Sequence, residues 1–113
     1  MTIAEQARTQ GFKANLLIRG RAVTSDSLDA QGVPETFTAL VEDQPMLADP
    51  DKPAQAQTPV YTRISALTGV IADPRKPQRF TENQGGRFHK VLRYEETSGD
   101  RVKWSWFCEA QRA

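Results

Sequence analysis

The sequence predicts a mainly β protein: a small antiparallel β-barrel or sandwich with one N-terminal α-helix. Three observations lead to this prediction. The chain has 113 residues, a length typical of a single domain. Residues 86–109 have the pattern of a β-hairpin, and several shorter alternating segments separated by turn signals precede it. Hydrophobic residues make up only 38% of the chain and the mean hydropathy is −0.59, so the core is expected to be thin.

An N-terminal helix is expected within residues 2–19, from about residue 3 to residue 18. Thr2 and Glu5 fit a capping box, in which the threonine hydroxyl accepts from a first-turn amide while the glutamate reaches back. Gly20 is expected to end the helix, as glycine often does. The apolar residues of this segment form no clean stripe, so the helix is expected to pack on a partner as much as on its own domain.

The middle of the chain is expected to alternate short strands with turns. A short strand at 21–24 leads into a polar loop at 25–34. Residues 35–42 alternate, which places Phe37, Ala39 and Val41 on one face of a second strand. Strands are also expected at 60–66 and 80–81.

Residues 44–59 differ in composition from the segments on either side. They contain four prolines among Ala, Gln, Asp and Lys, with little that a core could bury. A loop of this length in a small domain is usually functional or disordered, so we expect a long flexible loop there.

The closing hairpin is expected to turn about Ser98, with a three-residue loop ending in Gly99. The predicted register pairs Phe88 with Cys108, Lys90 with Trp106, Leu92 with Trp104, Tyr94 with Val102 and Glu96 with Asp100. This register gathers seven side chains on the inner face: Phe88, Leu92, Tyr94, Val102, Trp104, Trp106 and Cys108. His89 is then expected on the opposite face, beside Val91 and Arg93.

Charge and cysteine content narrow the function classes. The net charge is +1, which argues against a protein built mainly to coat nucleic acid. Residues 1–58 carry a net charge of −3 and residues 59–113 one of +4, a polarity suited to a protein partner or to copies of itself. A single cysteine, no signal peptide and no membrane-spanning run predict a soluble intracellular protein.

The sequence predicts no catalytic or metal site and no cofactor. His89 is the only histidine, and no Cys/His spacing offers a set of metal ligands. A small enzyme centred on His89 and Cys108 is a third hypothesis, but adjacent strand positions point to opposite faces, so the two side chains should diverge. Cys108 is therefore expected to be a small buried hydrophobe.

Two surface features remain as candidate contacts. A nucleic-acid platform would use Trp104, Trp106, Tyr94 and Phe88 for stacking, with Arg93, Arg101 and Lys103 on phosphates. The predicted alternation counts against it, because it separates the rings from the basic residues. Alternatively, a basic loop could meet an acidic run on a neighbouring copy, through Arg75, Lys76 and Arg79 and through Asp43, Asp49 and Asp51.

The order of these segments resembles that of the head–tail joining proteins of tailed bacteriophages. Phe37, Ala39, Asp43 and Pro45 match a phrase of the type F-x-A-x-x-x-D-x-P in the first half of those chains. Gly86, Phe88 and Val91 match a second phrase, G-x-x-Y-x-V, loosely, with phenylalanine where tyrosine is usual and a one-residue offset before the valine.

The resemblance implies a structural function, with no enzymatic activity. Copies would form a homo-oligomeric ring on the portal or connector of a filled head and offer the tail a docking surface. The implied location is the host cytoplasm during assembly and then the virion. A small barrel that binds oligonucleotides is the alternative.

Overall fold

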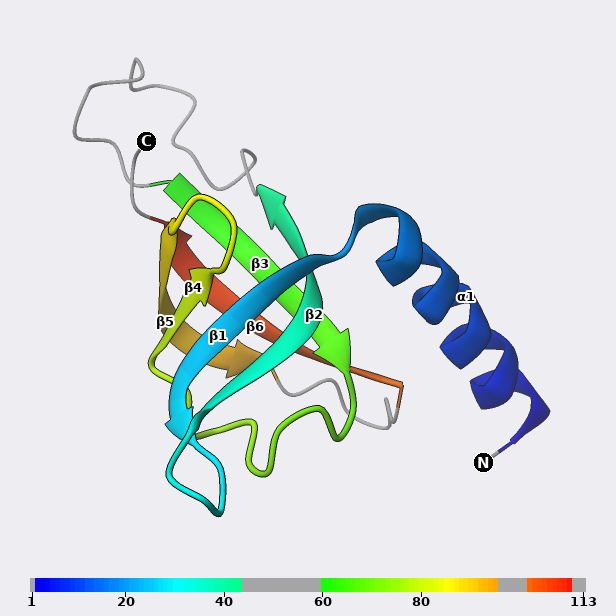
Figure 1. Ribbon diagram of the computed structural model, residues 1–113. Coiled ribbons are helices and arrows are strands. Elements are labelled where there is room, and N and C mark those ends of the chain that lie inside the picture. Colours follow the sequence, from blue (N-terminus) through cyan, green and yellow to red (C-terminus); the bar gives the residue numbers. More distant parts are fainter. Residues whose placement is uncertain (1, 44–59, 96–101, 111–113) are drawn as a thin grey trace.

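A computed structural model describes residues 2–43, 60–95 and 102–110 (Figure 1). The helix α1 spans Ile3–Arg19 and precedes six strands. These are β1 (Arg21–Leu28), β2 (Pro34–Asp43), β3 (Val60–Leu67), β4 (Arg79–Glu82), β5 (Phe88–Glu95) and β6 (Lys103–Ala110). The predicted fold class is confirmed, and the barrel form is the one adopted.

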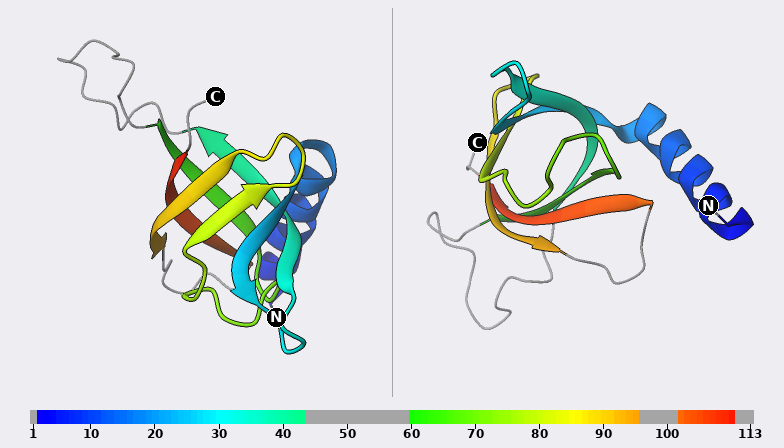
Figure 2. Two further views of the ribbon diagram at one scale, coloured as in Figure 1. Left: turned by 60° about the vertical axis from the view of Figure 1, so that its left-hand side comes forward. Right: turned by 90° about the horizontal axis from the view of Figure 1, so that it is seen from below.

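The six strands form one closed antiparallel barrel in the order β1-β2-β3-β6-β5-β4 (Figures 1 and 2). Closure depends on β1, which pairs with β2 along one edge and with the short β4 along the other. A closed sheet has no free edge strand, so every strand here has two neighbours.

Alternation along the strands fills the barrel with apolar side chains. Phe37 and Ala39 from β2 face inward, as predicted, and Val41 packs against the same core. The interior centres on the fully buried Trp106, whose ring lies 4.9 Å from that of Phe80. The buried core is Val23, Phe37, Ala39, Ile64, Ala66, Ile71, Phe80, Trp106 and Cys108.

The predicted helix is confirmed at its start and corrected at its end. The Thr2 hydroxyl accepts a hydrogen bond from the Glu5 N–H at 3.1 Å, as a capping residue should. Gly20 follows the helix but is extended, with φ −66°. A Cβ at this position would meet the Leu16 carbonyl and the Thr38 methyl group, so glycine is required by the close approach of the helix end to β2.

One strand prediction and one loop prediction need correction. The strand expected at 21–24 continues through 28, and only the tight turn between β1 and β2 remains of the loop expected at 25–34. The reason is that Ser25 and Ser27 face inward and hydrogen-bond to each other at 2.6 Å, so polar residues occupy buried strand positions there. The strands expected at 35–42, 60–66 and 80–81 are confirmed.

The closing hairpin exists, but its predicted register is wrong. Val91 lies opposite Cys108, and Lys90 lies opposite Glu109. The register shifts between Val91 and Arg93, so Leu92 forms a β-bulge. The expected loop at 97–99, the pairing of Glu96 with Asp100, and the expected flexible loop at 44–59 lie outside the described residues.

The bulge reverses the faces of the first half of β5. Tyr94, Trp104, Trp106 and Cys108 face or contact the core as predicted, and Val102 is buried. Phe88 and Leu92, expected inside, are 39% and 42% exposed, whereas His89, expected outside, is fully buried. One additional residue in a strand changes the side to which the residues before it point.

We expect Gly20→Ala to destabilise the protein, because the added methyl group must displace the end of α1 from β2. Overpacking of this kind costs about 1–3 kcal/mol in the free energy of unfolding, measurable by urea denaturation. The matched control is Gly11→Ala, where an added Cβ meets nothing within 4 Å. That change should stabilise the helix by up to about 1 kcal/mol, and equal effects at the two positions would contradict this account.

Candidate functional site

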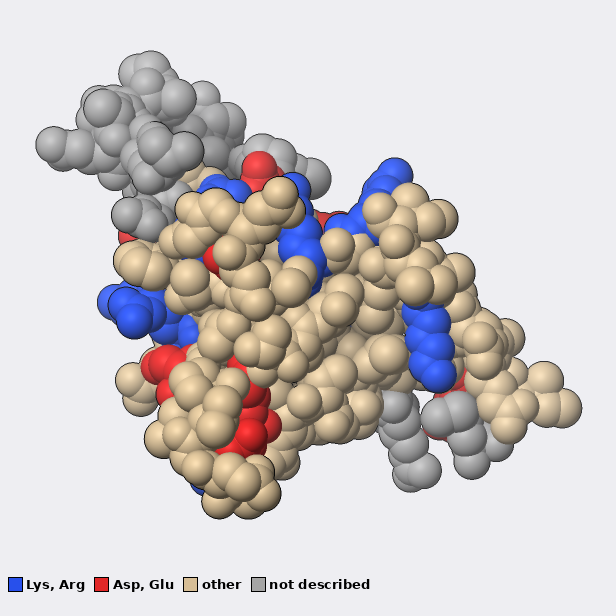
Figure 3. Space-filling view, viewed as in Figure 1, with Lys and Arg blue, Asp and Glu red and all other residues tan. Residues whose placement is uncertain are grey.

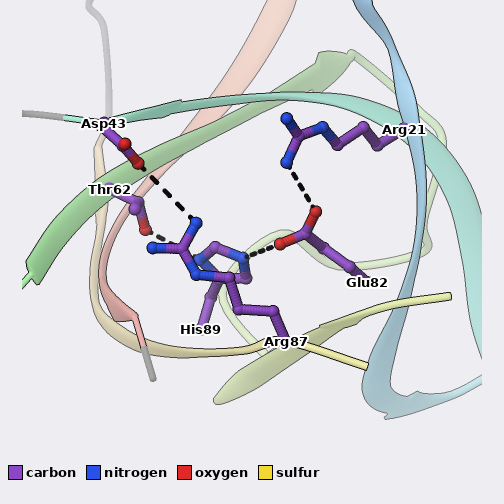
Figure 4. Close-up of polar contacts among 6 residues, drawn as sticks. All are labelled: Arg21, Asp43, Thr62, Glu82, Arg87 and His89. Atoms are coloured by element: carbon purple, nitrogen blue, oxygen red, sulfur yellow. Dashed lines mark hydrogen bonds and ion pairs between the residues drawn. The ribbon is translucent and has the colours of Figure 1, made fainter. Parts of the chain in front are cut away.

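A chain of polar side chains lies inside one end of the barrel (Figure 4). His89 on β5 is at its centre, with Nε2 2.9 Å from Glu82 Oε2 and Nδ1 2.9 Å from Thr62 Oγ1. Arg21 donates from Nη1 to the second Glu82 oxygen at 2.8 Å. We call Arg21, Glu82, His89 and Thr62 the polar cluster.

Four strands bring the polar cluster together from distant parts of the sequence. Glu82 is two residues after the core residue Phe80 on β4, so both face inward. His89 lies opposite Phe80 in the β4–β5 ladder, and Thr62 is inward-facing on β3. Arg21, at the start of β1, is more than half exposed and reaches in from the rim.

The hydrogen bonds of the cluster indicate which ring nitrogen of His89 carries the proton. An ionised Glu82 accepts from both neighbours, so His89 donates from Nε2 and its Nδ1 accepts from the Thr62 hydroxyl. This arrangement satisfies both ring nitrogens of a neutral imidazole. Arg21 then supplies the positive charge that balances Glu82.

Burial and hydrogen bonding shift both titrating groups. Burial lowers the pKa of His89, and the hydrogen bond to Glu82 offsets only part of that effect. For Glu82, burial opposes ionisation, but the hydrogen bonds from His89 and Arg21 outweigh it and lower the pKa of the carboxyl. Arg87 disfavours the charged imidazole and Asp43 favours it; these two form an ion pair at 3.8 Å.

The order hydroxyl, imidazole and carboxylate is that of a nucleophile, base and orienting acid. Burial argues against such a use, since Thr62 and His89 are both 0% exposed. The chemistry that the arrangement supports is the mutual satisfaction of buried polar groups. His89 was predicted on the face opposite the aromatic residues, and that prediction is wrong. That His89 is the single histidine of the chain could be seen from the sequence.

Cys108 is a buried core residue, as predicted. Burial, with a smaller contribution from Glu95, raises the pKa of its thiol to about 12, so the nucleophilic thiolate is scarce at neutral pH. Contrary to the prediction, His89 and Cys108 both point into the barrel. They do not form a catalytic pair there, because Thr62 and Glu82 occupy the two ring nitrogens of His89.

The predicted contact residues lie apart from the polar cluster, except at one point. Arg75 lies over the Tyr94 ring at 5.7 Å, Arg79 lies over the Phe88 ring at 4.7 Å, and Lys76 is exposed. Asp43 ends β2 beside the polar cluster and contacts Arg87 (Figure 4). Asp49 and Asp51 lie outside the described residues. A role for these residues between subunits stays a prediction.

The outer barrel wall carries a set of rings that the sequence reading missed. Tyr61 and Phe107 stack at 5.4 Å with an interplanar angle of 21°, and Arg93 lies over Phe107 at 4.7 Å. The stacking platform that the sequence disfavoured does not form from Trp104 and Trp106, because Trp106 is fully buried and Trp104 packs against the core, as the predicted alternation implied. Strand alternation from β3 and β6 could have indicated Tyr61 and Phe107, since their neighbours Thr62 and Cys108 are inward-facing.

We expect acid to destabilise the fold through His89. The unfolded histidine takes up a proton below its ordinary pKa of about 6.5, whereas the buried imidazole resists protonation. The unfolded chain then binds more protons, so the free energy of unfolding falls as the pH decreases through this range. Loss of the Glu82 charge continues the decrease below a pH of about 4.5, because its folded pKa is also lowered.

Urea unfolding from about pH 7 to about pH 5 measures this dependence. His89→Gln keeps an amide donor for Glu82 but does not titrate, so its stability should change less over the same range. A wild-type protein that becomes more stable as the pH falls, or an equal slope in the variant, would contradict the assignment of a neutral His89.

No protein-family model, curated protein or solved structure matches this chain. Over the residues described, α1 does not have the length and apolar character that a bilayer-crossing helix needs. Over the same residues, no group of three or more His, Cys, Asp or Glu side chains is arranged to hold a metal ion.

Proposed function

We propose that this chain is a structural protein of a tailed bacteriophage or prophage. It joins the DNA-filled head to the tail as a homo-oligomeric ring on the portal or connector. The observation that carries the proposal is the exposed apolar side of α1, where Ile3, Leu17 and Ile18 are 86%, 89% and 82% exposed. Large apolar side chains in such numbers on one element are typical of a surface that a partner covers.

The barrel supports the same proposal in a second way. Apolar side chains fill its interior, and His89 and Thr62 of the polar cluster are fully buried. Function is therefore expected on the outer surfaces, as in a protein that assembles with other proteins. The element order also agrees with the resemblance, since the Phe37 and Ala39 strand, the connection at 44–59 and the closing hairpin follow α1 in the expected sequence.

Charge on the outer surface is divided between regions. Figure 3 shows that the wall built by β1 and β2 is largely uncharged, with acidic side chains gathered near the turn between these strands. Asp26, Asp29 and Glu35 lie at that end. Uneven charge of this kind favours one orientation between neighbouring subunits over others.

Inactivation of the gene in its phage or prophage tests the proposed function. We expect DNA-filled heads and separate tails by electron microscopy, with tailed particles restored by a second copy of the gene. The gene is expected to lie between those for a major capsid protein and a tail tube protein. Normal tailed particles without the protein would contradict the proposal.

A second candidate function is binding of single-stranded nucleic acid on the outer wall. It is favoured by one observation: Phe107, Tyr61 and Arg93 lie side by side there, as a base-stacking surface requires. Against it, Glu95 lies on the same wall, 3.1 Å from Arg63, and Glu109 is on the neighbouring strand. Carboxylates repel phosphate, so we rank this candidate second.

Filter binding of a single-stranded oligonucleotide at low salt separates the two functions. We expect weak binding that Phe107→Ala leaves unchanged, with Leu92→Ala as a control at another exposed position of the wall. Binding that is tight, decreases steeply with salt and weakens about tenfold or more in Phe107→Ala would favour the second candidate.

A further inference from the structure

The strand β4 is the shortest link in the barrel wall. It has four residues, whereas each of the other strands has eight or ten. It pairs with β1 only over residues 80–82 and with β5 only over residues 79–81. Across the barrel, β3 and β6 pair along all eight residues of both strands. Release of β4 therefore opens the barrel with the loss of few backbone hydrogen bonds.

Two backbone hydrogen bonds mark the two seams of β4. On the β1 side, the Asn83 N–H donates to the Ala22 carbonyl at 2.9 Å. On the β5 side, the Val91 N–H donates to the Gln78 carbonyl at 2.9 Å. Both bonds break when β4 leaves the wall, so each amide reports on one seam.

The polar cluster clasps both seams through Glu82, the last residue of β4. One carboxylate oxygen accepts from Arg21 of β1 at 2.8 Å, and the other lies 2.9 Å from His89 Nε2 on β5. Phe80 holds the same strand by apolar packing, with its ring 4.9 Å from that of Trp106. The apolar contact does not depend on pH, whereas the Glu82 contacts involve a ring that can take up a proton.

The charges around His89 are already balanced when its ring is neutral. Arg21 on β1 and Arg87 before β5 are positive, and Glu82 on β4 and Asp43 on β2 are negative (Figure 4). The inward-facing neighbours from the described parts of β3 and β6 are the uncharged Thr62, Cys108 and Ala110. An added proton would leave an uncompensated positive charge on a ring that is 0% exposed, which is costly.

Protonation of the ring also removes a hydrogen-bond acceptor. Nδ1 of the neutral ring accepts from the Thr62 hydroxyl at 2.9 Å. An imidazolium has an N–H on both nitrogens and cannot accept, so the Thr62 hydroxyl would have to turn and donate elsewhere. Water solvates the ring in both protonation states. Acid therefore favours a state in which His89 reaches water.

We propose that β4 is an acid-sensitive latch, which leaves β1 and β5 when His89 is protonated while the β3–β6 ladder stays paired. The lowered pKa of His89 agrees with this direction. A cavity of about 450 Å³, lined in part by Arg21, Glu82 and Asn83, hollows the wall where β1 meets the end of β4. Opening is expected to begin there. The inference goes beyond the proposed joining function and does not depend on it.

Amide hydrogen exchange, followed by NMR on the full-length protein at about pH 7.5 and about pH 5.5, tests the latch. After correction for the intrinsic exchange rate, we expect the Asn83 and Val91 amides to exchange several-fold faster at the lower pH. The upper limit is about tenfold, which is the ratio that a group with an unfolded pKa of about 6.5 supplies over this range. Glu82 stays ionised throughout, because its pKa is lowered from 4.5.

Urea separates opening of the latch from global unfolding. Low urea should leave exchange at Asn83 and Val91 nearly unchanged, because release of one short strand exposes little surface. The amides of β3 and β6 should be better protected at both pH values and should exchange faster as urea is added.

Three variants assign the pH dependence to His89. His89→Gln keeps an amide donor for Glu82 but does not titrate, so exchange at the two reporter amides should no longer depend on pH. Arg21→Gln removes one hold on Glu82 and one nearby positive charge. It should raise exchange at about pH 7.5 and reduce the ratio between the two pH values. Arg19→Gln removes the same charge from the exposed end of α1 and should retain the wild-type pattern.

The latch is overturned by any of three results. The first is protection of Asn83 and Val91 equal to that of the β3 and β6 amides, which indicates a single cooperative unfolding. The second is wild-type exchange at these two amides that does not change with pH. The third is a wild-type pH ratio in His89→Gln or in Arg21→Gln. None of these results bears on the joining function, which gene inactivation tests separately.

Discussion

The β-bulge at Leu92 is the constraint on which the functional features of this barrel depend. Side chains alternate across a sheet, so a single additional residue changes which of them face the interior. With the bulge in place, Tyr94 contacts the core from one half of β5 and His89 points inward from the other half. The same change turns Phe88 outward. The buried His89 of the polar cluster and the exposed Phe88 are thus two consequences of one local irregularity.

An inward-facing histidine requires partners, and the closed barrel supplies them. An isolated imidazole in an apolar interior would leave two polar nitrogens unsatisfied, which is costly. Glu82 and Thr62 lie within 2.9 Å on either side of the ring, and Arg21 reaches in from the rim to balance the carboxylate. The cluster links β1, β3, β4 and β5, so it ties both sides of the closure strand β4 to the rest of the wall.

The helix is attached to the barrel along one side only. Leu16 anchors α1 on the barrel, and Gly20 allows the helix end to approach β2 closely. This attachment leaves the other side of the helix, with Leu17 and Ile18, directed outward. The helix therefore presents exposed apolar side chains on the side turned away from the barrel.

Local chemistry in the sequence determined the elements of this protein. The Thr2 cap and the alternation of Phe37 and Ala39 predicted the helix and a strand, because caps and alternation act over a few residues. The sequence also indicated that Cys108 is buried.

The tertiary structure alone decided what those elements place together. Nothing in the order of residues 88–95 marks Leu92 as a bulge, because the shift arises from pairing with β6 and β4 in a closed wall. The polar cluster joins residues 21, 62, 82 and 89 only once the barrel closes, so no local pattern could have revealed it. Of its members, only His89 was singled out from the sequence, and it was expected on the opposite face of the hairpin. Their meeting is a property of the closed sheet, where register sets which side chains share the interior.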